Sequence, residues 1–455
     1  MGTGPSSLAN CIGWFEAHNG PLSSTGPDVA CVNGTNVTRW MDLSGDLNHM
    51  DQATPANCPF WYSDPNEPFP LVRFPRNDAT GIRCIFRTAS PTLDRAAMSV
   101  FAVCRHDGTQ GSISGNSMFL FGGGVGGTHG SIEIGQPGYP SPRCTYRLAQ
   151  NGSFNSYTTI RVPNSLGFIG LSCGASSVKA YIDNQSSMAG AAYGAGTSTG
   201  WALGAATGAL GSPWYGDVAA LFVFNAALSD ANVETLRAYC RNRWTLPTIA
   251  YNVVCEGDSI TSGVPATLNN RVLSWQVDLP RSFRTHCVGR AGEQIAQSVT
   301  DFAVGTQGCF DATLGPGRNI LVYWMGTNDI SGSSGATVYA AYASYCATAR
   351  ANGWKVVAVT MLPRNTGGNE TNRTDFNTLL RANWSNFADA LADVDLCSLM
   401  NTVASTASSY YEADRIHPSE LGNRVLGTIL QQAVFEAAQV ASPTPRVPRA
   451  SVIQA

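Results

Sequence analysis

The chain has 455 residues and a formal net charge of −3 at pH 7, and charged residues make up 13% of it, against about 25% in a typical globular protein. This near-neutral balance offers no electrostatic footprint for a nucleic acid or an anionic membrane surface. No apolar run is long enough to cross a bilayer. The length allows about three domains, and the abundance of Gly and small polar residues favours β-rich, turn-rich domains of extracellular type.

The thirteen cysteines and the first residues bear on cofactors and compartment. The cysteines form no CxxC pair and no Cys/His spacing typical of zinc. We expect neither a metal nor an organic cofactor. Several could form disulfides in an exported protein, and buried free thiols are the alternative. Met1–Ser7 lacks the pattern of a secretory leader. We expect an extracellular or particle-associated protein, with its leader removed or with another export route.

Before about residue 248, short alternating or apolar runs are separated by turn residues. The runs expected to form strands are Met98–Cys104, Ser117–Phe121, Thr158–Val162, Gly167–Cys173, Val178–Ile182 and Val218–Phe224. Strands at this spacing, with turn chemistry between them, predict an all-β sandwich over residues 1–247. One helix closes this half, with Ser229 as its N-cap and its end near Trp244.

After residue 248 the expected elements alternate between strand and helix. The expected strands are Tyr251–Cys255, Thr285–Val288, Asn319–Met325, Lys355–Leu362 and Val394–Cys397, and the expected helices are Ala336–Ala351, Thr374–Leu391 and Leu421–Val440. Near-continuous apolar strands between amphipathic helices predict a parallel sheet covered on both faces, over residues 248–441. Residues 442–455 are Pro-rich, and we expect a disordered tail.

Four short motifs stand in order along this second region, the first three of them where expected strands end. They are Gly257-Asp258-Ser259, Gly289-Arg290-Ala291-Gly292, Gly326-Thr327-Asn328-Asp329 and Asp414-Arg415-Ile416-His417-Pro418. A serine hydroxyl is a poor nucleophile at neutral pH and needs an adjacent base. The set supplies a nucleophile, an Asp–His pair to activate it, and groups that donate hydrogen bonds to a developing negative charge.

These four motifs resemble the blocks of the SGNH hydrolases, also called the GDSL family of esterases and lipases. The resemblance covers roughly residues 252–440. It implies a three-layer α/β/α fold similar to flavodoxin, with the site at the carboxyl ends of the strands. It assigns Ser259 as the nucleophile, His417 as the general base and Asp414 as the residue that orients His417.

The same resemblance assigns the oxyanion hole to the backbone N–H groups of Ser259 and Gly292 and to the side-chain amide of Asn328. Glycine at position 292 would let the chain approach the substrate without a Cβ atom. In one respect the sequence departs from the family pattern. Cys287 stands where the second block often has Asn, two residues before its first Gly. This departure puts the hydrogen bonding of that loop in doubt more than the donor itself.

Each motif alone also has a purely structural interpretation. Gly-Asp-Ser is typical of turns, Gly326–Asp329 could be a strand-to-helix loop, and Asp414 could cap a helix. A fifth motif, Gly170-Leu171-Ser172-Cys173-Gly174, matches the G-x-S-x-G nucleophile elbow. An expected strand rather than a helix follows it, so we predict a hairpin there.

The amino-terminal half resembles concanavalin A-like (laminin G-like) jelly rolls. The resemblance lies in Trp40–Asn48, Lys179–Asn184 and Val218–Ser229. It implies a domain that binds glycans or serves as a spacer. Asp42 and Asp46 could ligate calcium through their oxygens, although shaping the turn is the simpler role. An exposed Trp could stack on a sugar ring.

Together these features predict a two-domain serine carboxylic ester hydrolase, most plausibly an O-acetylesterase that acts on acetylated carbohydrate through an acyl-enzyme. Its amino-terminal domain would hold the enzyme on the glycan. A lipase or lysophospholipase with the same residues and a longer acyl pocket is one alternative. The other is a glycan-binding surface or virion adhesion protein with a vestigial esterase domain. Retention of Ser259, Asp414 and His417 argues against a decayed site.

Overall fold

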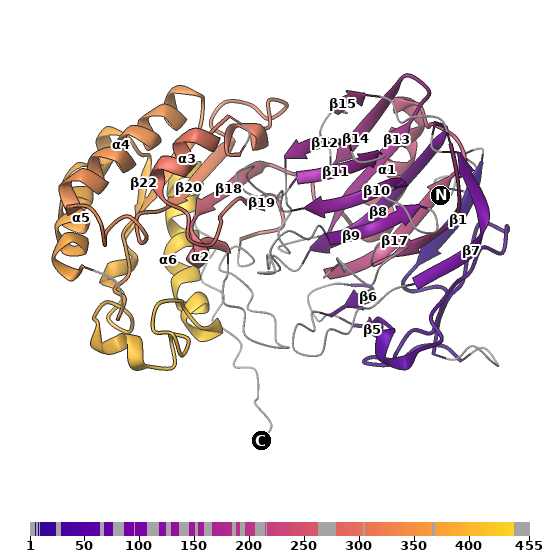
Figure 1. The fold of residues 1–455 in the computed structure, drawn as a ribbon, viewed down its shortest axis with the longest axis horizontal. Helices are drawn as coiled ribbons and strands as arrows, with labels where there is room; N and C mark the ends of the chain where they lie inside the picture. The colour runs from indigo at the N-terminus through magenta and orange to yellow at the C-terminus, as the bar shows by residue number, and fades with distance from the viewer. Residues whose placement is uncertain are drawn as a thin grey trace.

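The computed structural model shows strands gathered in the amino-terminal half and alternating strands and helices in the carboxy-terminal half (Figure 1). It describes residues 5, 8, 10–23, 29–63, 68–75, 86–94, 96–106, 118–123, 129–135, 145–150, 153–158, 166–183, 188–191, 196–204, 214, 216–262, 279–303, 305–365 and 369–440. No helix in these ranges is both long enough and apolar enough to cross a membrane.

The amino-terminal half contains two antiparallel sheets. Its elements are β1 (Cys11–Glu16), β2 (Pro21–Leu22), β3 (Arg39–Trp40), β4 (Met50–Asp51), β5 (Phe60–Tyr62), β6 (Leu71–Phe74), β7 (Phe86–Asp94), β8 (Met98–His106), β9 (Met118–Gly123), β10 (His129–Gly135), β11 (Thr145–Gln150), β12 (Ser153–Thr158), β13 (Gly167–Cys173), β14 (Ser177–Ile182), β15 (Met188–Ala191), β16 (Thr197–Leu203), β17 (Gly216–Phe224) and α1 (Asp230–Trp244). One sheet has the order β15-β14-β13-β8-β17-β6-β5, with β1 also paired to β17. The other has the order β12-β11-β10-β9-β16-β7-β4-β3-β2.

The sheet that contains β8 and β17 is apolar on both faces. Val100 and Val223 on one face share a core with Trp201 of the other sheet. Phe101 and Phe222 on the opposite face pack with residues of α1, including Trp244. Such two-sided burial explains why β13 and β17 are continuously buried, and why their sequences read as apolar runs rather than alternating ones.

The carboxy-terminal half is built on a parallel sheet with the order β19-β18-β20-β21-β22. Its elements are β18 (Tyr251–Gly257), α2 (Ser259–Ser262), β19 (Phe283–Cys287), α3 (Ile295–Asp301), β20 (Asn319–Trp324), α4 (Gly335–Ala351), β21 (Lys355–Val359), α5 (Glu370–Asn383), β22 (Ala390–Ala392) and α6 (Glu420–Ala438), with short 3-10 turns at Gln307–Cys309, Trp384–Asn386, Val394–Leu396 and Ala404–Ala407.

Helices cover both faces of this parallel sheet. Leu426 and Leu430 of α6 pack against one face, and Tyr342 of α4 and Phe376 of α5 pack against the other. Figure 1 shows α6 apart from α4 and α5 in this arrangement. The predicted parallel sheet with helices on both faces is confirmed for this half.

Most expected elements are present, with two errors near the last strand. The strand expected at Val394–Cys397 is wrong, because Val394–Leu396 forms a 3-10 turn and the strand is β22, Ala390–Ala392. The helix expected to continue to Leu391 ends at Asn383. Apolar residues at 387–392 continue the helical stripe, and a short apolar run does not distinguish helix from strand by itself.

Pairing with β21 decides the structure of that segment. Asp389 accepts hydrogen bonds from Lys355 Nζ and from the backbone N–H of Val356, both at 2.9 Å. These bonds hold the chain that leads into β22 against β21. The expected strand Thr158–Val162 and the tail 442–455 lie mostly or wholly outside the described residues. The boundaries 1–247, 248–441 and 442–455 stay predictions.

A buried polar network lies near the amino ends of β18, β19 and β20. The Arg284 side chain is fully buried, and its Nη2 donates to Asp311 Oδ2 at 2.6 Å and to Asn252 Oδ1 at 3.1 Å. Asn252 Nδ2 donates to Asn319 Oδ1 at 2.9 Å. Arg284 Nη1 also lies 3.9 Å from Asp183 Oδ2 in the turn after β14. The network therefore joins the edge strand β19 to the amino-terminal half.

Several of the described cysteines contribute to the cores as thiols. Cys173, Cys240 and Cys346 are buried, and burial raises the pKa of each thiol well above its usual value. A thiol in such surroundings behaves as a small apolar side chain. For these residues the buried-thiol alternative holds.

Candidate active site

The turn between β18 and α2 places Ser259 at the carboxyl end of the sheet. Gly257 ends the strand, where a Cβ atom would lie 2.1 Å from Thr261 Oγ1 and 2.5 Å from the carbonyl oxygen of Trp324. Only glycine fits such a close approach. The chain turns at Asp258 and enters α2 at Ser259, and the side chain of Ser259 is half-buried.

The loop before α6 brings a histidine and a carboxylate to Ser259. His417 Nε2 lies 2.7 Å from Ser259 Oγ, and His417 Nδ1 lies 2.6 Å from Asp414 Oδ2. Both distances are those of hydrogen bonds. The three residues that the sequence singled out as nucleophile, base and orienting acid therefore form one hydrogen-bonded chain, although 158 positions separate Ser259 from His417.

Asp414 is held in place by its own loop. Its Oδ1 accepts from the backbone N–H groups of Ile416 at 2.9 Å and His417 at 3.1 Å. Partial burial pushes the pKa of Asp414 upward, but the hydrogen bonds from the His417 ring and from these two N–H groups outweigh it, and the net shift is downward. The carboxylate is thus ionised at neutral pH and suited to fix the tautomer of His417.

The loop that contains Gly292 and the loop that contains Asn328 are tied together. Asn328 Nδ2 donates to the carbonyl oxygen of Glu293 at 2.9 Å, and Gln294 Nε2 donates to the carbonyl oxygen of Asn328 at 3.2 Å. An amide nitrogen carries two N–H donors, so this contact uses one of them. Gly292 has a φ of +75°, and a Cβ atom there would meet nothing within 4 Å. Left-handed backbone rather than crowding is therefore what favours glycine at this position.

Cys287, the departure from the family pattern, is buried behind the serine turn. Its Sγ donates to the carbonyl oxygen of Thr261 at 3.4 Å. Thr261 lies in α2, two residues after Ser259. The cysteine thus supports the turn that presents the nucleophile.

The sequence reading missed two carboxyl groups beside the nucleophile. Asp258 is almost fully buried, and burial raises its pKa to about 7, assisted by the negative charge of Asp329. Its Oδ1 accepts from the backbone N–H of Ile260 at 2.9 Å. Asp329 accepts from the backbone N–H of Ile295 at 3.3 Å, and burial raises its pKa as well. Both residues belong to the short motifs of the sequence, and that position could have indicated that they lie beside the nucleophile.

Arg364 was also missed. It follows the carboxyl end of β21, and its Nη1 donates to the carbonyl oxygen of Thr327 at 2.9 Å. Its position just after a parallel strand could have marked it, because ligand sites lie at that edge of such sheets.

The calcium interpretation of Asp42 and Asp46 gains nothing from the structure. Asp42 accepts from the backbone N–H groups of Trp14 and Ser44, both at 2.9 Å, and from that of Asn48 at 3.0 Å. These bonds shape the turn. In the described ranges, no group of three or more His, Cys, Asp or Glu side chains could hold a metal ion. The Gly170–Gly174 motif is the end of β13 and its turn to β14, as predicted for a hairpin.

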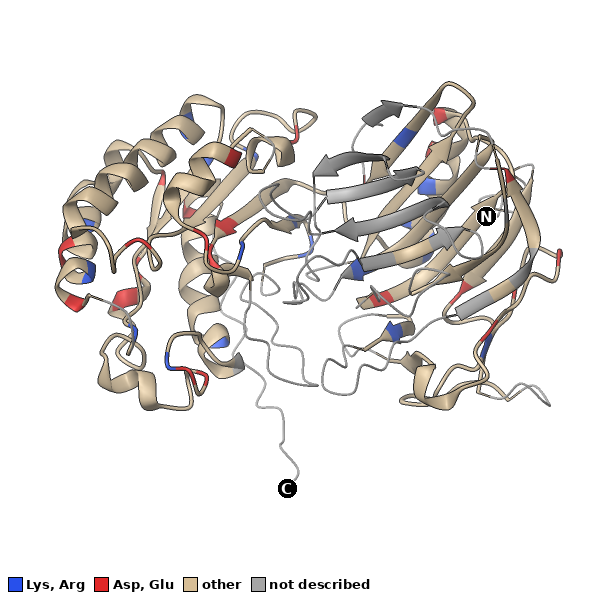
Figure 2. Cartoon of the chain, in the orientation of Figure 1, with Lys and Arg blue, Asp and Glu red and all other residues tan. Residues whose placement is uncertain are grey.

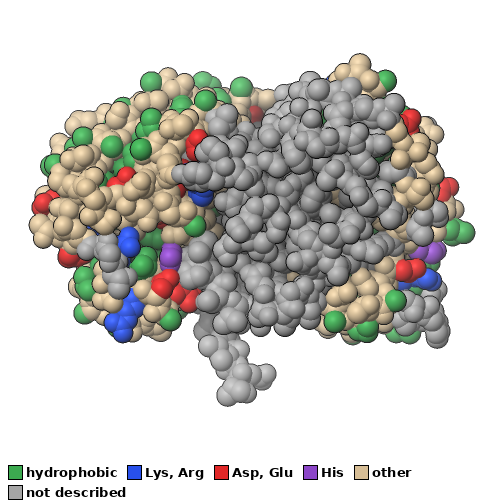
Figure 3. Space-filling view, viewed as in Figure 1, with side chains coloured by type: hydrophobic (Ala, Val, Ile, Leu, Met, Phe, Trp, Pro, Cys, Tyr) green, Lys and Arg blue, Asp and Glu red, His purple; other side chains and the backbone are tan. Residues whose placement is uncertain are grey.

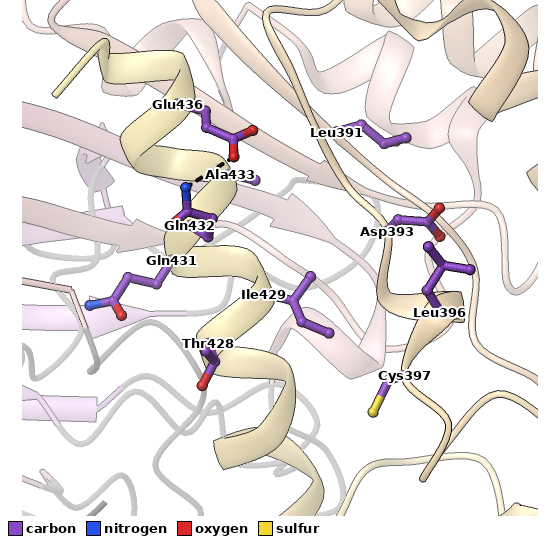
Figure 4. A pocket seen from close by; sticks show the side chains of 10 residues that line it. All are labelled: Leu391, Asp393, Leu396, Cys397, Thr428, Ile429, Gln431, Gln432, Ala433 and Glu436. Atoms are coloured by element: carbon purple, nitrogen blue, oxygen red, sulfur yellow. Dashed lines mark hydrogen bonds between the residues drawn. The ribbon is translucent and has the colours of Figure 1, made fainter. Parts of the chain in front are cut away.

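Among the residues that the structure describes, surface charge and apolar exposure identify no second site. Acidic and basic residues are interspersed over the described parts of both halves (Figure 2). On the face drawn in Figure 3, exposed apolar side chains of the carboxy-terminal half are scattered. A cavity of about 500 Å³ lies between α6 and the segment after β22, lined by residues that include Leu391, Ile429 and Glu436 (Figure 4). It contains none of the residues of the Ser259–His417–Asp414 chain.

Comparison with known proteins agrees with this geometry. Residues 255–425 match the GDSL-like lipase/acylhydrolase family. The matched range contains Ser259, Gly292, Asn328, Asp414 and His417. The carboxy-terminal half therefore contains a GDSL-like lipase/acylhydrolase domain, and the protein is a serine esterase of this type. No curated protein matches the chain.

Solved structures similar to the chain include TesA, at 18% identity over 41% of this chain and 99% of TesA, with a TM-score of 0.33. An acetyl xylan esterase, AlAXEase, is 20% identical over 40% of this chain and 99% of its own, with a TM-score of 0.30. The YXIM protein of Bacillus subtilis is 12% identical over 80% of this chain and 83% of its own, with a TM-score of 0.32. Likenesses at this level assign no substrate.

Proposed function

We propose that this serine esterase removes small acyl groups, acetyl above all, from carbohydrate through a covalent acyl-enzyme. The observation that supports this mechanism is the hydrogen-bonded chain from Asp414 through His417 to Ser259. Ser259 Oγ attacks the ester carbonyl carbon while His417 Nε2 takes the hydroxyl proton. His417 then gives that proton to the departing sugar oxygen, and the acyl group stays on Ser259.

Water completes the cycle by the same route. The water oxygen attacks the acyl carbon while His417 takes a proton from that water. His417 then returns the proton to Ser259 Oγ as the carboxylic acid leaves. In both steps the carbonyl oxygen becomes negatively charged. In this proposal, that oxygen accepts hydrogen bonds from the backbone N–H groups of Ser259 and Gly292 and from the side-chain amide of Asn328. A hydrogen bond to the carbonyl oxygen of Glu293 holds the Asn328 amide in its loop. The reaction as written uses no metal or organic cofactor.

The preference for acetylated carbohydrate is the more specific part of the proposal. Support comes from the amino-terminal half, whose two antiparallel sheets suit a glycan-binding jelly roll of the concanavalin A-like kind. In this proposal the sheets hold the enzyme on an acylated glycan, outside the cell or on a particle. The acyl group would be small, because the sugar rather than the acyl chain supplies the binding energy.

Hydrolysis of p-nitrophenyl acetate, butyrate and octanoate tests the proposal, with Ser259→Ala as the control. We expect the highest kcat/KM on acetate and none above background in Ser259→Ala. Acetylated xylan should then release acetate, and a truncated substrate without the sugar should be slower. Preference for octanoate would favour a lipase or lysophospholipase. Glycan binding without turnover of any ester would favour an adhesion protein.

A further inference from the structure

We infer that Arg364 is a positioning residue, which fixes the oxyanion loop of Asn328 relative to the loop of His417. The inference rests on the proposed function, since it concerns how fast the same site works. Arg364 and its neighbour Asn365 stand just after β21, in the loop between that strand and α5. Each of the two contacts a different catalytic loop.

The first contact is made by the Arg364 side chain. Its Nη1 donates to the carbonyl oxygen of Thr327 at 2.9 Å. That carbonyl belongs to the peptide unit that leads into Asn328, whose amide is the proposed oxyanion donor. A charged donor makes a stronger hydrogen bond than a neutral one. The guanidinium therefore restrains the backbone from which the Asn328 side chain extends.

The second contact is made by the next residue. The backbone N–H of Asn365 donates to the carbonyl oxygen of Arg415 at 3.2 Å. Arg415 lies between Asp414 and His417 and has a φ of +57°. Residues other than glycine seldom adopt this left-handed backbone conformation. Contacts from outside the loop are what such backbone needs to persist. Neighbouring residues thus hold the oxyanion loop and the histidine loop at one spacing.

The charges around Arg364 fit this role. Burial and the charge of Asp329 raise the pKa of Asp258, and the positive charge of Arg364 opposes that rise. Asp329 and Arg364 are thus two charged groups that act on Asp258. Arg364 is half-buried, with its guanidinium on a backbone carbonyl and its charge near the carboxyl group of Asp258.

Contacts already described tie the Asn328 loop to the Gly292 loop, namely those of Asn328 with Glu293 and Gln294. They do not reach the loop of His417. Loss of the Arg364 side chain should therefore leave the oxyanion loop folded but let it shift relative to the base. A displacement of about 1 Å in a catalytic group costs up to about 10²-fold in rate.

The test compares Arg364→Met, Arg364→Lys and Arg350→Met in the full chain, with an acetate ester as substrate. Methionine keeps the aliphatic stem and removes the donor and charge. Lysine restores both. Arg350, in the last turn of α4, is the control away from the site. Its Nη1 donates to the carbonyl oxygen of Asn386, 36 positions away, and its Nε lies 3.5 Å from Asp389 Oδ2. We expect kcat to fall about 10- to 10²-fold in Arg364→Met at unchanged KM and melting temperature.

Arg364→Lys should recover most of this loss, and Arg350→Met should match the wild type. Wild-type kcat in Arg364→Met would overturn the inference, as would a loss confined to melting temperature. A rise in KM with unchanged kcat would also overturn it, because that result indicates substrate binding instead. If the wild type hydrolyses no ester, the proposed function and this inference fail together. Wild-type turnover with an unaffected Arg364→Met variant rejects the inference alone.

Discussion

The two ends of the parallel sheet hold polar side chains in opposite ways. At the amino end, Arg284 and Asp311 are almost completely buried and paired with each other. At the carboxyl end, the side chain of Asp414 is 35% exposed and that of His417 14% exposed, and their hydrogen bonds run in a line to Ser259. A closed, buried network holds strands together, whereas a chain of groups that ends at an accessible hydroxyl can exchange protons with a substrate.

The two ends of the sheet show that a buried polar residue can serve either stability or catalysis. Removing one partner of a buried pair leaves an uncompensated charge, which destabilises the fold. Removing a member of the chain at the other end should change the rate of catalysis instead, because solvent reaches those groups. Variants at both ends of the sheet test this contrast.

The largest effect should come from Asp414→Asn. The amide cannot hold His417 in the tautomer that accepts the Ser259 proton, and we expect kcat to fall about 10⁴-fold. The unfolding free energy should change little, since Asp414 is near the surface. Steady-state kinetics and urea unfolding measure the two quantities. A variant that loses stability but keeps its turnover would show that Asp414 stabilises the fold rather than assisting catalysis.

Asp311→Ala should show the opposite pattern. Arg284 would remain buried with only Asp183, whose Oδ2 lies 3.9 Å from Arg284 Nη1, as a charged partner. We expect a cost of up to about 3–5 kcal/mol in unfolding free energy. Turnover per folded molecule at low temperature should match the wild type. Asp51→Ala is the control, because the pair Arg39–Asp51 is only half-buried, with side chains 29% and 45% exposed, and should contribute about 1 kcal/mol or less. Equal losses in the two variants would remove the distinction between the buried and the exposed pair, and Asp311→Asn covers the case of a misfolded alanine variant.

Asn328→Ala should reduce kcat about 10²–10³-fold, the usual effect of losing one oxyanion donor. The variant keeps the serine, histidine and aspartate, so it should still react with a phosphonate ester, although more slowly. The measurement is kcat on an acetate ester. Near wild-type turnover would show that Asn328 only braces the loop of Glu293 through the contact seen in the structure.

The last prediction concerns the pH dependence of stability. The pKa of Asp258 is raised to about 7 by burial, from an unfolded value of about 3.9. Between these values the folded state holds the proton and the unfolded state does not. The unfolding free energy should therefore fall as pH rises from about 4 to about 7, by up to about 1.4 kcal/mol per pH unit.

Asp258→Asn is the variant that isolates this contribution. Asn keeps an oxygen that can accept from the backbone N–H of Ile260 but carries no ionisable group. The difference in unfolding free energy between wild type and variant, measured by denaturant at several pH values, should slope downward over that range. A flat difference would show that Asp258 is ionised in the folded protein.

Local pattern was enough to predict much of the carboxy-terminal half. Apolar runs predicted β18, β20 and β21 there, and in the amino-terminal half Ser229 was correctly predicted as the N-cap of α1. It failed at β22, where the pairing of Asp389 with β21 outweighs a helical stripe. Arg364 was not predicted, because no local pattern indicates that it contacts the carbonyl oxygen of Thr327, 37 positions away.

The chemistry available to this protein follows from its sequence alone: a serine, a histidine, an aspartate and an asparagine in short motifs, which local turn and strand preferences place near strand ends. Which of its many polar groups meet depends on the tertiary fold. Hydrogen bonds depend on distances of a few ångströms between residues far apart in the chain, and parallel strand pairing sets those distances. It brought His417 to Ser259 and buried Arg284 with Asp311 at the opposite end of the sheet.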